Sequence, residues 1–439
     1  MKNVLIARIT LSALICLSSR SIAQTNDLPI DTLTVESAMA LAVEHQPLLQ
    51  AADAEVASAE AGKRLALSNY WPQLSFSASG THTEGIFVFN PSIAARNQIY
   101  STYTTGFTAS QLIYDFGKTS SRVGANTDLV TASKQDSRLA SMTVATGVEV
   151  AFYAAMQAKE LTVVNQETVK QNEDHLRMAQ AFYKAGTRPL LDVTQAEVNL
   201  ANANVGLITA RNAERVALLQ LENSMGVHLR PGYVLKGNVN TSPLDISLDS
   251  ARTVAMQQRP DILSARAHYD ALSAFASATF GLHLPTIAAT GTYNWSGFDV
   301  KLYGRWTAGL TFSLPIFQGF GINAQVDQAN AAVQAQFAQV RLIYESAMLD
   351  VEQNYLAVDA AAERIAATSK LVEQADESLR LAEKQYAAGV GTAIEVTDAQ
   401  VARANARITA IQAVYDHTIA ITRLRESMGT ISTQHPNGQ

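Results

Sequence analysis

The chain has 439 residues, of which 47% are hydrophobic and 16% charged, and its formal net charge is −6. A nucleic-acid-binding chain would be expected to show a basic patch, and this acidic sequence contains none. The single cysteine, Cys16, excludes an internal disulfide framework. The length fits one large domain or two to three ordinary domains.

The first 23 residues have the pattern of a secretory signal peptide. Lys2 and Arg8 precede an apolar run, 9–17, and 21–23 reads Ser-Ile-Ala, a small-x-small cleavage site. We expect cleavage after Ala23, which also removes the cysteine. The exported chain then has 30 basic and 39 acidic residues, a net charge of −9. After this segment we find no run of roughly 18 apolar residues and expect no transmembrane helix.

The next pattern predicts a helix followed by two strands. The helix is expected over 35–70, with Pro72 just after its end. The segments 73–81 and 101–113 then alternate strictly between apolar and polar residues, which is typical of strands with one apolar and one polar face. The apolar sets are Leu74, Phe76 and Ala78, and then Tyr103, Phe107, Ala109 and Ile113. We expect 81–100, between the strands, to be an extended external loop.

A long alanine-rich helical pattern follows over 117–185. It breaks at Gly186 and resumes to Met225, and glycine is the residue expected just past a helix end. At about 1.5 Å per residue, the first of these helices would be on the order of 100 Å long. A helix of this length is not expected in an ordinary globular domain.

The second half of the chain repeats this order. Residues 183–203 and 386–406 match without a gap at a shift of 203, with 10 of 21 positions identical. We predict two helix–hairpin–helix–helix repeats, 32–230 and 244–430, joined by a linker, 231–243, and followed by a polar tail, 431–439. The second repeat is expected to hold a helix over 248–282, strands in 286–294 and 305–314, and long helices over 320–388 and then to Met428, broken at Gly389.

Two interpretations of the four strands are open. One is a sheet packed on a soluble core. The other is a membrane β-barrel, which suits a face rich in Ser and Thr opposite a face of aromatic and aliphatic residues. A membrane sheet must close to satisfy its edges, and barrels begin at about eight strands, so a chain with four strands would have to oligomerise. The alanine-rich helices, with apolar residues spaced by three and four, suit long antiparallel coiled-coil packing.

With this combination of features, the sequence resembles the TolC family of outer-membrane efflux proteins. The resemblance is carried by the duplicated order, by a "Y-x-A-G-x…[DE]-V-T-x-A" turn in both halves, and by "LIYDFGK" (112–118) and "LPIFQGF" (314–320), where strand passes into helix. It implies an α+β membrane protein. Three chains, each giving four strands, would form a 12-stranded β-barrel in the outer membrane, continuous with a long α-helical coiled-coil barrel in the periplasm.

The resemblance also implies a function and partners. Such a protein is a passive gated duct of a tripartite efflux or secretion system. Its partners are two further copies of itself, a periplasmic adaptor protein, an inner-membrane pump and outer-membrane lipid. The cargo is not specified by the sequence, because selectivity mostly belongs to the pump. Neither an enzyme activity nor a cofactor or metal is expected, since the histidines are scattered and phosphate-loop and nucleophile-turn motifs are absent from the sequence.

In this family, polar contacts among Tyr, Asp and Arg side chains hold the periplasmic entrance closed. Tyr386 and Asp192 match two of these positions. The arginine position, two residues after the second glycine, is Gly391 here, which departs from the family pattern. Arg188, at the equivalent place in the first repeat, is a candidate substitute; its alternative role is that of a solvated turn residue.

Further candidate residues surround the two glycine turns. Glu395 and Asp398 match acidic positions that ring the entrance and would favour cations, although a plain polar helix face is the alternative. The turns expected to dock the adaptor contain Gly186, Thr187, Gly389 and Val390. Their alternative role is turn geometry alone.

Aromatic residues on the strands suggest an interfacial girdle, with ordinary packing on a strand face as the alternative. The candidates are Tyr100, Tyr103, Trp295 and Trp306. Two other classes of protein stay open for the whole chain: an exported structural or adhesive coiled-coil protein without a pore, and a cell-surface receptor. The four strands with a lipid-type face argue against the first, and the lack of a large external segment argues against the second.

Overall fold

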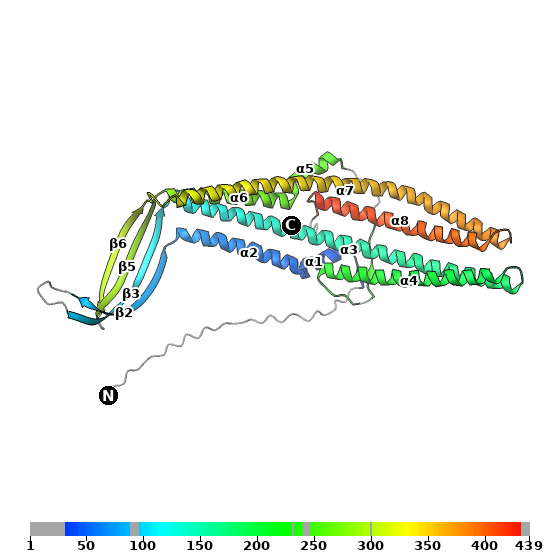
Figure 1. Cartoon of the computed structure of the whole chain (residues 1–439), viewed down its shortest axis with the longest axis horizontal. Helices are drawn as coiled ribbons and strands as arrows, with labels where there is room; N and C mark the ends of the chain where they lie inside the picture. The colour runs from blue at the N-terminus through cyan, green and yellow to red at the C-terminus, as the bar shows by residue number, and fades with distance from the viewer. Residues whose placement is uncertain (1–30, 88–95, 231, 240–245, 299–300, 432–439) are drawn as a thin grey trace, which may run out of the picture.

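A computed structural model of the chain describes residues 31–87, 96–230, 232–239, 246–298 and 301–431. The expected signal peptide, 1–23, with Cys16, lies outside the described residues, as do parts of the expected linker and nearly all of the expected tail. Figure 1 shows an elongated chain in which the strands gather at one end, and two helical hairpins reach their tips at the other.

The helix expected over 35–70 is interrupted. It forms α1 (Val35–His45), α2 (Pro47–Leu67) and a short 3-10 turn, η1 (Ser68–Tyr70). Gln46 between α1 and α2 is extended, with φ −71° and ψ 117°. Pro47 is the cause, since a proline disfavours helical geometry in the residue before it but suits the first position of a new helix.

The second half is interrupted in the same way. Its segments are α5 (Leu248–Gln258), α6 (Pro260–Phe280) and η2 (Gly281–His283), and the extended residue is Arg259, before Pro260. The prediction of one continuous helix over 35–70 and over 248–282 is therefore wrong at these two points. The linker also contains structure, because β4 (Val234–Leu235) pairs in parallel with β1 (Thr32–Leu33).

The four long strands form one antiparallel sheet in the order β2-β3-β5-β6. They are β2 (Gln73–Phe87), β3 (Arg96–Tyr114), β5 (Thr286–Phe298) and β6 (Tyr303–Ser313). Pairing of β3 with β5 joins the two predicted hairpins. Most of the segment 81–100, expected to be a loop, is strand; its remainder, 88–95, lies outside the described residues.

The apolar residues predicted for the strands fall on one face of this sheet, except Ile113, which lies at a bulge in β3 where Tyr114 takes the paired position. Phe76 pairs with Phe107, Phe107 with Tyr293, and Tyr293 with Trp306, which makes an aromatic row across all four strands. Leu310 on β6 belongs to the same face, and 76% of it is exposed. In a soluble protein such a face would be covered, so an exposed apolar sheet marks an interaction surface.

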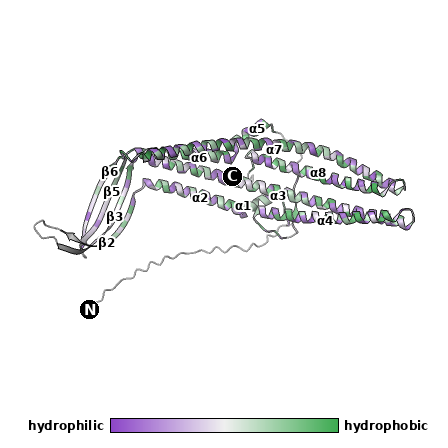
Figure 2. Cartoon of the chain, viewed as in Figure 1, coloured by the Kyte–Doolittle hydropathy of each residue, from purple (hydrophilic) through white to green (hydrophobic). Residues whose placement is uncertain are grey.

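The long helices are α3 (Lys118–Lys184), α4 (Leu190–Met225), α7 (Gly321–Ala387) and α8 (Ala393–Ser427). In Figure 1, α3 and α4 form one hairpin and α7 and α8 the other. Figure 2 shows polar and apolar residues interleaved along their lengths. Contrary to the sequence expectation, α3 contains an 18-residue window apolar enough to cross a membrane, but half of that window is buried inside the protein, as in a core helix.

The main core lies at the middle of the helical part. Apolar residues of α1, α3 and α4 meet there, with Phe152 of α3 fully buried, and α8 contributes Tyr415. Nearer the tips, each hairpin has a small apolar cluster of its own. One is Ala179, Val193 and Ala196 in α3 and α4, and the other is Leu379, Tyr386, Ala393, Val396 and Ala399 in α7 and α8.

Candidate functional site at the helix tips

The two tip turns have the same backbone design. Gly186 and Gly389 adopt left-handed φ values of 73° and 80°, which favour glycine. The N–H of Gly186 donates to the carbonyl of Tyr183, and that of Thr187 to the carbonyl of Phe182; Gly389 and Val390 make the equivalent bonds. This is the Schellman arrangement that ends a helix. The four residues predicted to dock the adaptor are exposed at these turns.

The three predicted gate residues come together across the two hairpins. Tyr386 of α7 is 1% exposed, and its hydroxyl donates a hydrogen bond to Oδ2 of Asp192 on α4, at 3.4 Å. The guanidinium carbon of Arg188 lies 4.9 Å from the centre of the Tyr386 ring, in a cation–π contact. Asp192 also stands in the first turn of α4, where a carboxylate is favourable beside free N–H groups.

Gly391 occupies the position where the family pattern has arginine. A Cβ atom there would lie 3.0 Å from Cβ of Gln385 and 3.0 Å from the backbone nitrogen of Tyr386, so a side chain would be crowded and these neighbours would have to shift. The carbonyl oxygen of Gly391 instead accepts a hydrogen bond from Nη2 of Arg188, at 2.7 Å. A guanidinium therefore reaches the second tip from the first hairpin.

Two aromatic residues that the sequence analysis missed surround Tyr386. The rings of His175 and Phe182, both on α3, lie 5.4 Å and 5.7 Å from the Tyr386 ring. Their spacing of seven residues, leading up to Gly186, is the signal that places them on one helix face. His175 is 2% exposed, and its Nδ1 atom has no hydrogen-bond partner among the described residues.

Burial sets the charge state of this group. It lowers the pKa of His175, and the nearby carboxylate of Asp192 opposes that shift. Burial also raises the pKa of Tyr386; Asp192 adds to this shift and Arg188 opposes it. At neutral pH, the tip thus holds a neutral histidine and a neutral tyrosine between one cation and one anion.

The predicted acidic ring residues lie at the start of α8. Oε2 of Glu395 accepts a hydrogen bond from the N–H of Thr392, at 2.8 Å, while the Thr392 hydroxyl accepts from the N–H of Glu395. This reciprocal pair is a capping box. Glu395 therefore has a structural role that the sequence analysis did not assign, and Asp398 is exposed one turn further along.

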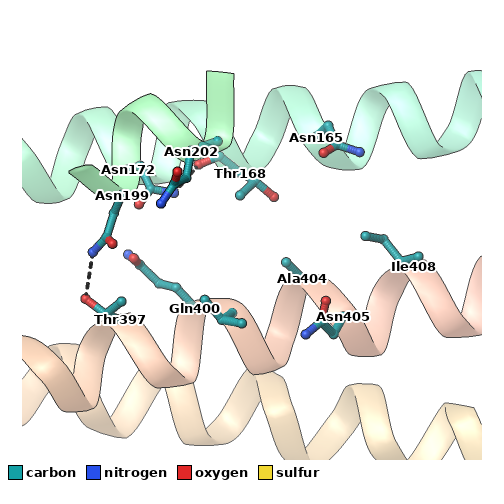
Figure 3. Close-up of a pocket in the computed structure, with 12 residues that line it drawn as sticks. Asn165, Thr168, Asn172, Asn199, Asn202, Thr397, Gln400, Ala404, Asn405 and Ile408 are labelled. Carbon is teal, nitrogen blue, oxygen red and sulfur yellow. Dashed lines mark hydrogen bonds between the residues drawn. The ribbon is translucent and has the colours of Figure 1, made fainter. Parts of the chain in front are cut away.

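A pocket of about 260 Å³, lined by both polar and apolar side chains, lies between the hairpins, on the side of the tips that faces the strands. Figure 3 shows side chains from α3, α4 and α8 converging on it, with a hydrogen bond of 3.0 Å from Asn199 to Thr397. Gln400 is only 6% exposed, and its Oε1 atom has no hydrogen-bond partner in the part of the chain that the structure describes. The polar lining is Asn165, Thr168, Asn172, Asn199, Asn202, Thr397, Gln400 and Asn405.

The sequence analysis also missed this pocket. The signal was polar residues at spacings of three and four, such as 165, 168 and 172, on helix faces that are otherwise apolar. Of the predicted girdle, Tyr103, Trp295 and Trp306 share the apolar face of the sheet, while the side chain of Tyr100 lies outside the described residues. In the part of the chain that the structure describes, no three His, Cys, Asp or Glu side chains converge to hold a metal.

Comparison with known proteins shows the family. The family model described as "Outer membrane efflux protein" matches residues 38–227 and 252–430, most of the chain. The chain therefore belongs to the family of outer membrane efflux proteins, which are transport channels, and its location is the outer membrane.

Similar curated proteins carry consistent descriptions. Outer membrane protein TolC of Escherichia coli K12 is 26% identical over 57% of this chain, and the match spans 54% of its own length, about half of that relative. The probable efflux pump outer membrane protein TtgC of Pseudomonas putida is 24% identical over 77% of the chain and 70% of the relative. The outer membrane efflux protein BepC of Brucella suis is 21% identical over 91% and 86%.

Solved structures show the same fold. A membrane protein from Pseudomonas aeruginosa superposes with a TM-score of 0.82, at 20% identity, over 92% of both chains. The MtrE outer membrane channel of Neisseria gonorrhoeae, in a structure described as its open state, gives a TM-score of 0.76 at 20% identity over 91% of both.

Proposed function

We propose that the chain is one protomer of a homotrimeric, gated efflux duct. The observation that carries this proposal is an open four-stranded sheet whose apolar face is uncovered. Among the described residues, its outer strands, β2 and β6, each pair with one neighbour only. Within a membrane such edges must be paired, since hydrocarbon offers the backbone no hydrogen bonds. Three copies of four strands give a closed barrel of twelve, within the known size range.

The helices then form the part of the duct that crosses the periplasm. Each chain would contribute the repeats 32–230 and 244–430, joined by 231–243, and each repeat ends in one tip turn. Transport through the duct is passive, and the contacts among Arg188, Asp192 and Tyr386 keep the tips together in the closed state. We assign Glu395 and Asp398 to an acidic ring at the entrance, where three copies of each would favour cations.

The partners follow from the relatives and from the exposed turns. TtgC is described as part of an efflux pump, and we propose that this chain likewise works with an inner-membrane pump through a periplasmic adaptor. The adaptor would dock on the exposed turns at Gly186, Thr187, Gly389 and Val390, which a trimer presents six times. A structural coiled-coil role would leave the uncovered apolar sheet without a purpose, so we do not favour it.

A matched pair of substitutions on β6 tests the barrel. Leu310 and Thr311 are neighbours on opposite faces of the strand. We expect Leu310→Lys to destabilise the protein in phospholipid vesicles by about 2–4 kcal/mol if it lies near the bilayer midplane, and Thr311→Lys to cost far less. The readouts are urea unfolding in vesicles and native mass spectrometry of the oligomer. Equal effects of the two variants, or a monomer in the intact membrane extract, would contradict the proposal.

A further inference from the structure

The two hairpins meet mainly through polar contacts near their tips. The small apolar cluster of Ala179 with Val193 lies within one hairpin. That of Leu379 with Val396 lies within the other, with Phe182 of α3 packed against it from the first hairpin. The contacts between the hairpins include those of Arg188 and Asp192, the aromatic group around Tyr386, the bond from Asn199 to Thr397, and the ion pair of Arg407 with Glu167. Each tip is therefore held together internally by apolar packing. The contact region between the two hairpins, which we call the seam, is mostly polar, apart from the aromatic contact of Phe182 with Tyr386.

The pocket in this seam contains several amide side chains, which carry both donors and acceptors, among apolar residues such as Val401 and Ile408. Its polar side chains are uncharged, and Nδ2 of Asn165 and of Asn172 donates to the carbonyl one turn back on α3, at 2.8 Å in both cases. Their amide oxygens remain free to accept. The buried Oε1 atom of Gln400 is a further acceptor without a partner, and Gln400 extends from α8 toward α3 and α4 in Figure 3.

We propose that this pocket binds a cluster of ordered water molecules, anchored on Gln400, and that the hydrated seam sets how far the hairpins separate. Water can donate to the unpartnered amide oxygens and accept from the amide N–H groups of the lining, and the volume is large enough for several molecules. The part of the inference that concerns opening rests on the proposed function, and the water site itself does not. Separating the hairpins along a hydrated seam costs little free energy, because water already hydrogen-bonds to the groups that become exposed.

The seam has a defined end on the side away from the tips. The ion pair between Arg407 and Glu167, at 2.6 Å, lies at its border. Beyond it, Ile411 and Tyr415 of α8 pack into the main core with Phe152, where separation would expose apolar surface to water. The stretch of α8 from Thr397 to Ile408 spans about 17 Å at about 1.5 Å per residue. We place the hinge of opening at Ile411–Tyr415.

The water site is tested by a crystal structure of the folded chain that resolves solvent. We expect ordered water within hydrogen-bond distance of Oε1 of Gln400, and its loss in Gln400→Leu. A pocket that is dry in the wild type, or that is closed by direct side-chain contacts, would overturn the proposal.

The seam is tested by hydrogen exchange with mass spectrometry on the full chain in detergent. In the wild type, amides over 397–408 should exchange about tenfold faster than those over 415–424, because local opening is cheaper there. Gln400→Leu should slow the first segment several-fold by drying the seam, whereas Gln400→Ala, which leaves room for water, should not. Gln412→Leu makes the same change at an exposed position of α8 and is the control.

Uniform exchange along α8, or a Gln400→Leu variant that behaves like Gln412→Leu, would refute the hydrated seam. Conductance separates this from the proposed function. If the wild type forms no pore in a bilayer, the duct is refuted, while the exchange pattern and the ordered water still decide the pocket.

Discussion

Arg188 and Gly391 lie 203 residues apart and hydrogen-bond to each other at 2.7 Å. That separation is also the shift between the two repeats, so the bond joins equivalent positions of the two tip turns. The repeats have diverged so that one supplies a guanidinium and the other the bare backbone that accepts it. The tyrosines at equivalent positions of the two repeats have also diverged in environment, since Tyr386 is buried in the seam while Tyr183 is 46% exposed.

Arg188→Ala is expected to loosen the tips. The substitution removes a charged hydrogen bond and a cation–π contact, and we expect a loss of about 1–2 kcal/mol because the site is partly exposed. Open-channel events in a planar bilayer should rise about tenfold. Arg177→Ala removes an exposed arginine that pairs only along α3, with Asp174, and should leave the openings unchanged. Equal behaviour of the two variants would leave Arg188 as a solvated turn residue.

Restoring the family's arginine by Gly391→Arg is expected to weaken the closed tip. The new Cβ would press on Gln385 and on the backbone of Tyr386, and it would disturb the carbonyl that Arg188 uses. We expect a lower Tm and more frequent openings than in the wild type. The double variant with Arg188→Gly should not restore the wild-type behaviour, and full restoration would show that the position accepts a side chain.

Substitutions of Glu395 can separate its role in capping α8 from the effect of its charge on cation selectivity. Glu395→Gln keeps the capping-box hydrogen bond but removes the carboxylate, so cation selectivity should fall without loss of stability. Glu395→Ala removes both and should also lower the stability by about 1 kcal/mol. Reversal potentials and thermal unfolding measure the two effects, with Asp398→Asn as the test of the second ring position. Unchanged selectivity in all three variants would confine Glu395 to its capping role.

The buried His175 predicts that acid loosens the tips. Burial holds the pKa of His175 below its ordinary value, so the closed state binds fewer protons than an opened state in which the ring is solvated. The neutral ring's stabilisation of the closed state is therefore complete above about pH 6.5 and is lost as the pH falls below that value. The equilibrium constant for opening rises by at most about tenfold per pH unit. Openings should increase between pH 7 and pH 5, and His175→Phe should abolish the increase.

Burial fixes the sign of that effect. The carboxylate of Asp192 favours the protonated ring and so opposes the lowering of the His175 pKa without reversing it. An unchanged pH response in His175→Phe would assign the effect to other groups.

Alternation and glycine signals predicted much of the fold. The apolar faces of the strands and the helix ends at Gly186 and Gly389 are local properties, since a period of two or a left-handed turn is written in neighbouring residues. The breaks at Gln46 and Arg259 were missed although Pro47 and Pro260 signal them, because the surrounding helical pattern dominated. The strand pairing within 81–100 was missed because it depends on the partner strand.

The candidate site was predicted less completely. The resemblance pointed to Asp192 and Tyr386, which hydrogen-bond to each other in the structure, while their role as a gate stays a prediction; Arg188 was considered because of its place in the repeat. His175, Gln400 and the asparagines of the pocket depend on how the two hairpins pack, which no single helix pattern specifies. The crowding at Gly391 likewise depends on the path of the backbone around the turn.

The central claim is a duct closed at its helix tips, and single-channel conductance tests it most directly. Detergent-purified wild type should give small, cation-selective steps in a planar bilayer. The steps should grow in Asp192→Ala and in Tyr386→Phe, each of which breaks the bond between the hairpins. A folded, membrane-extracted oligomer that conducts no current would contradict the account.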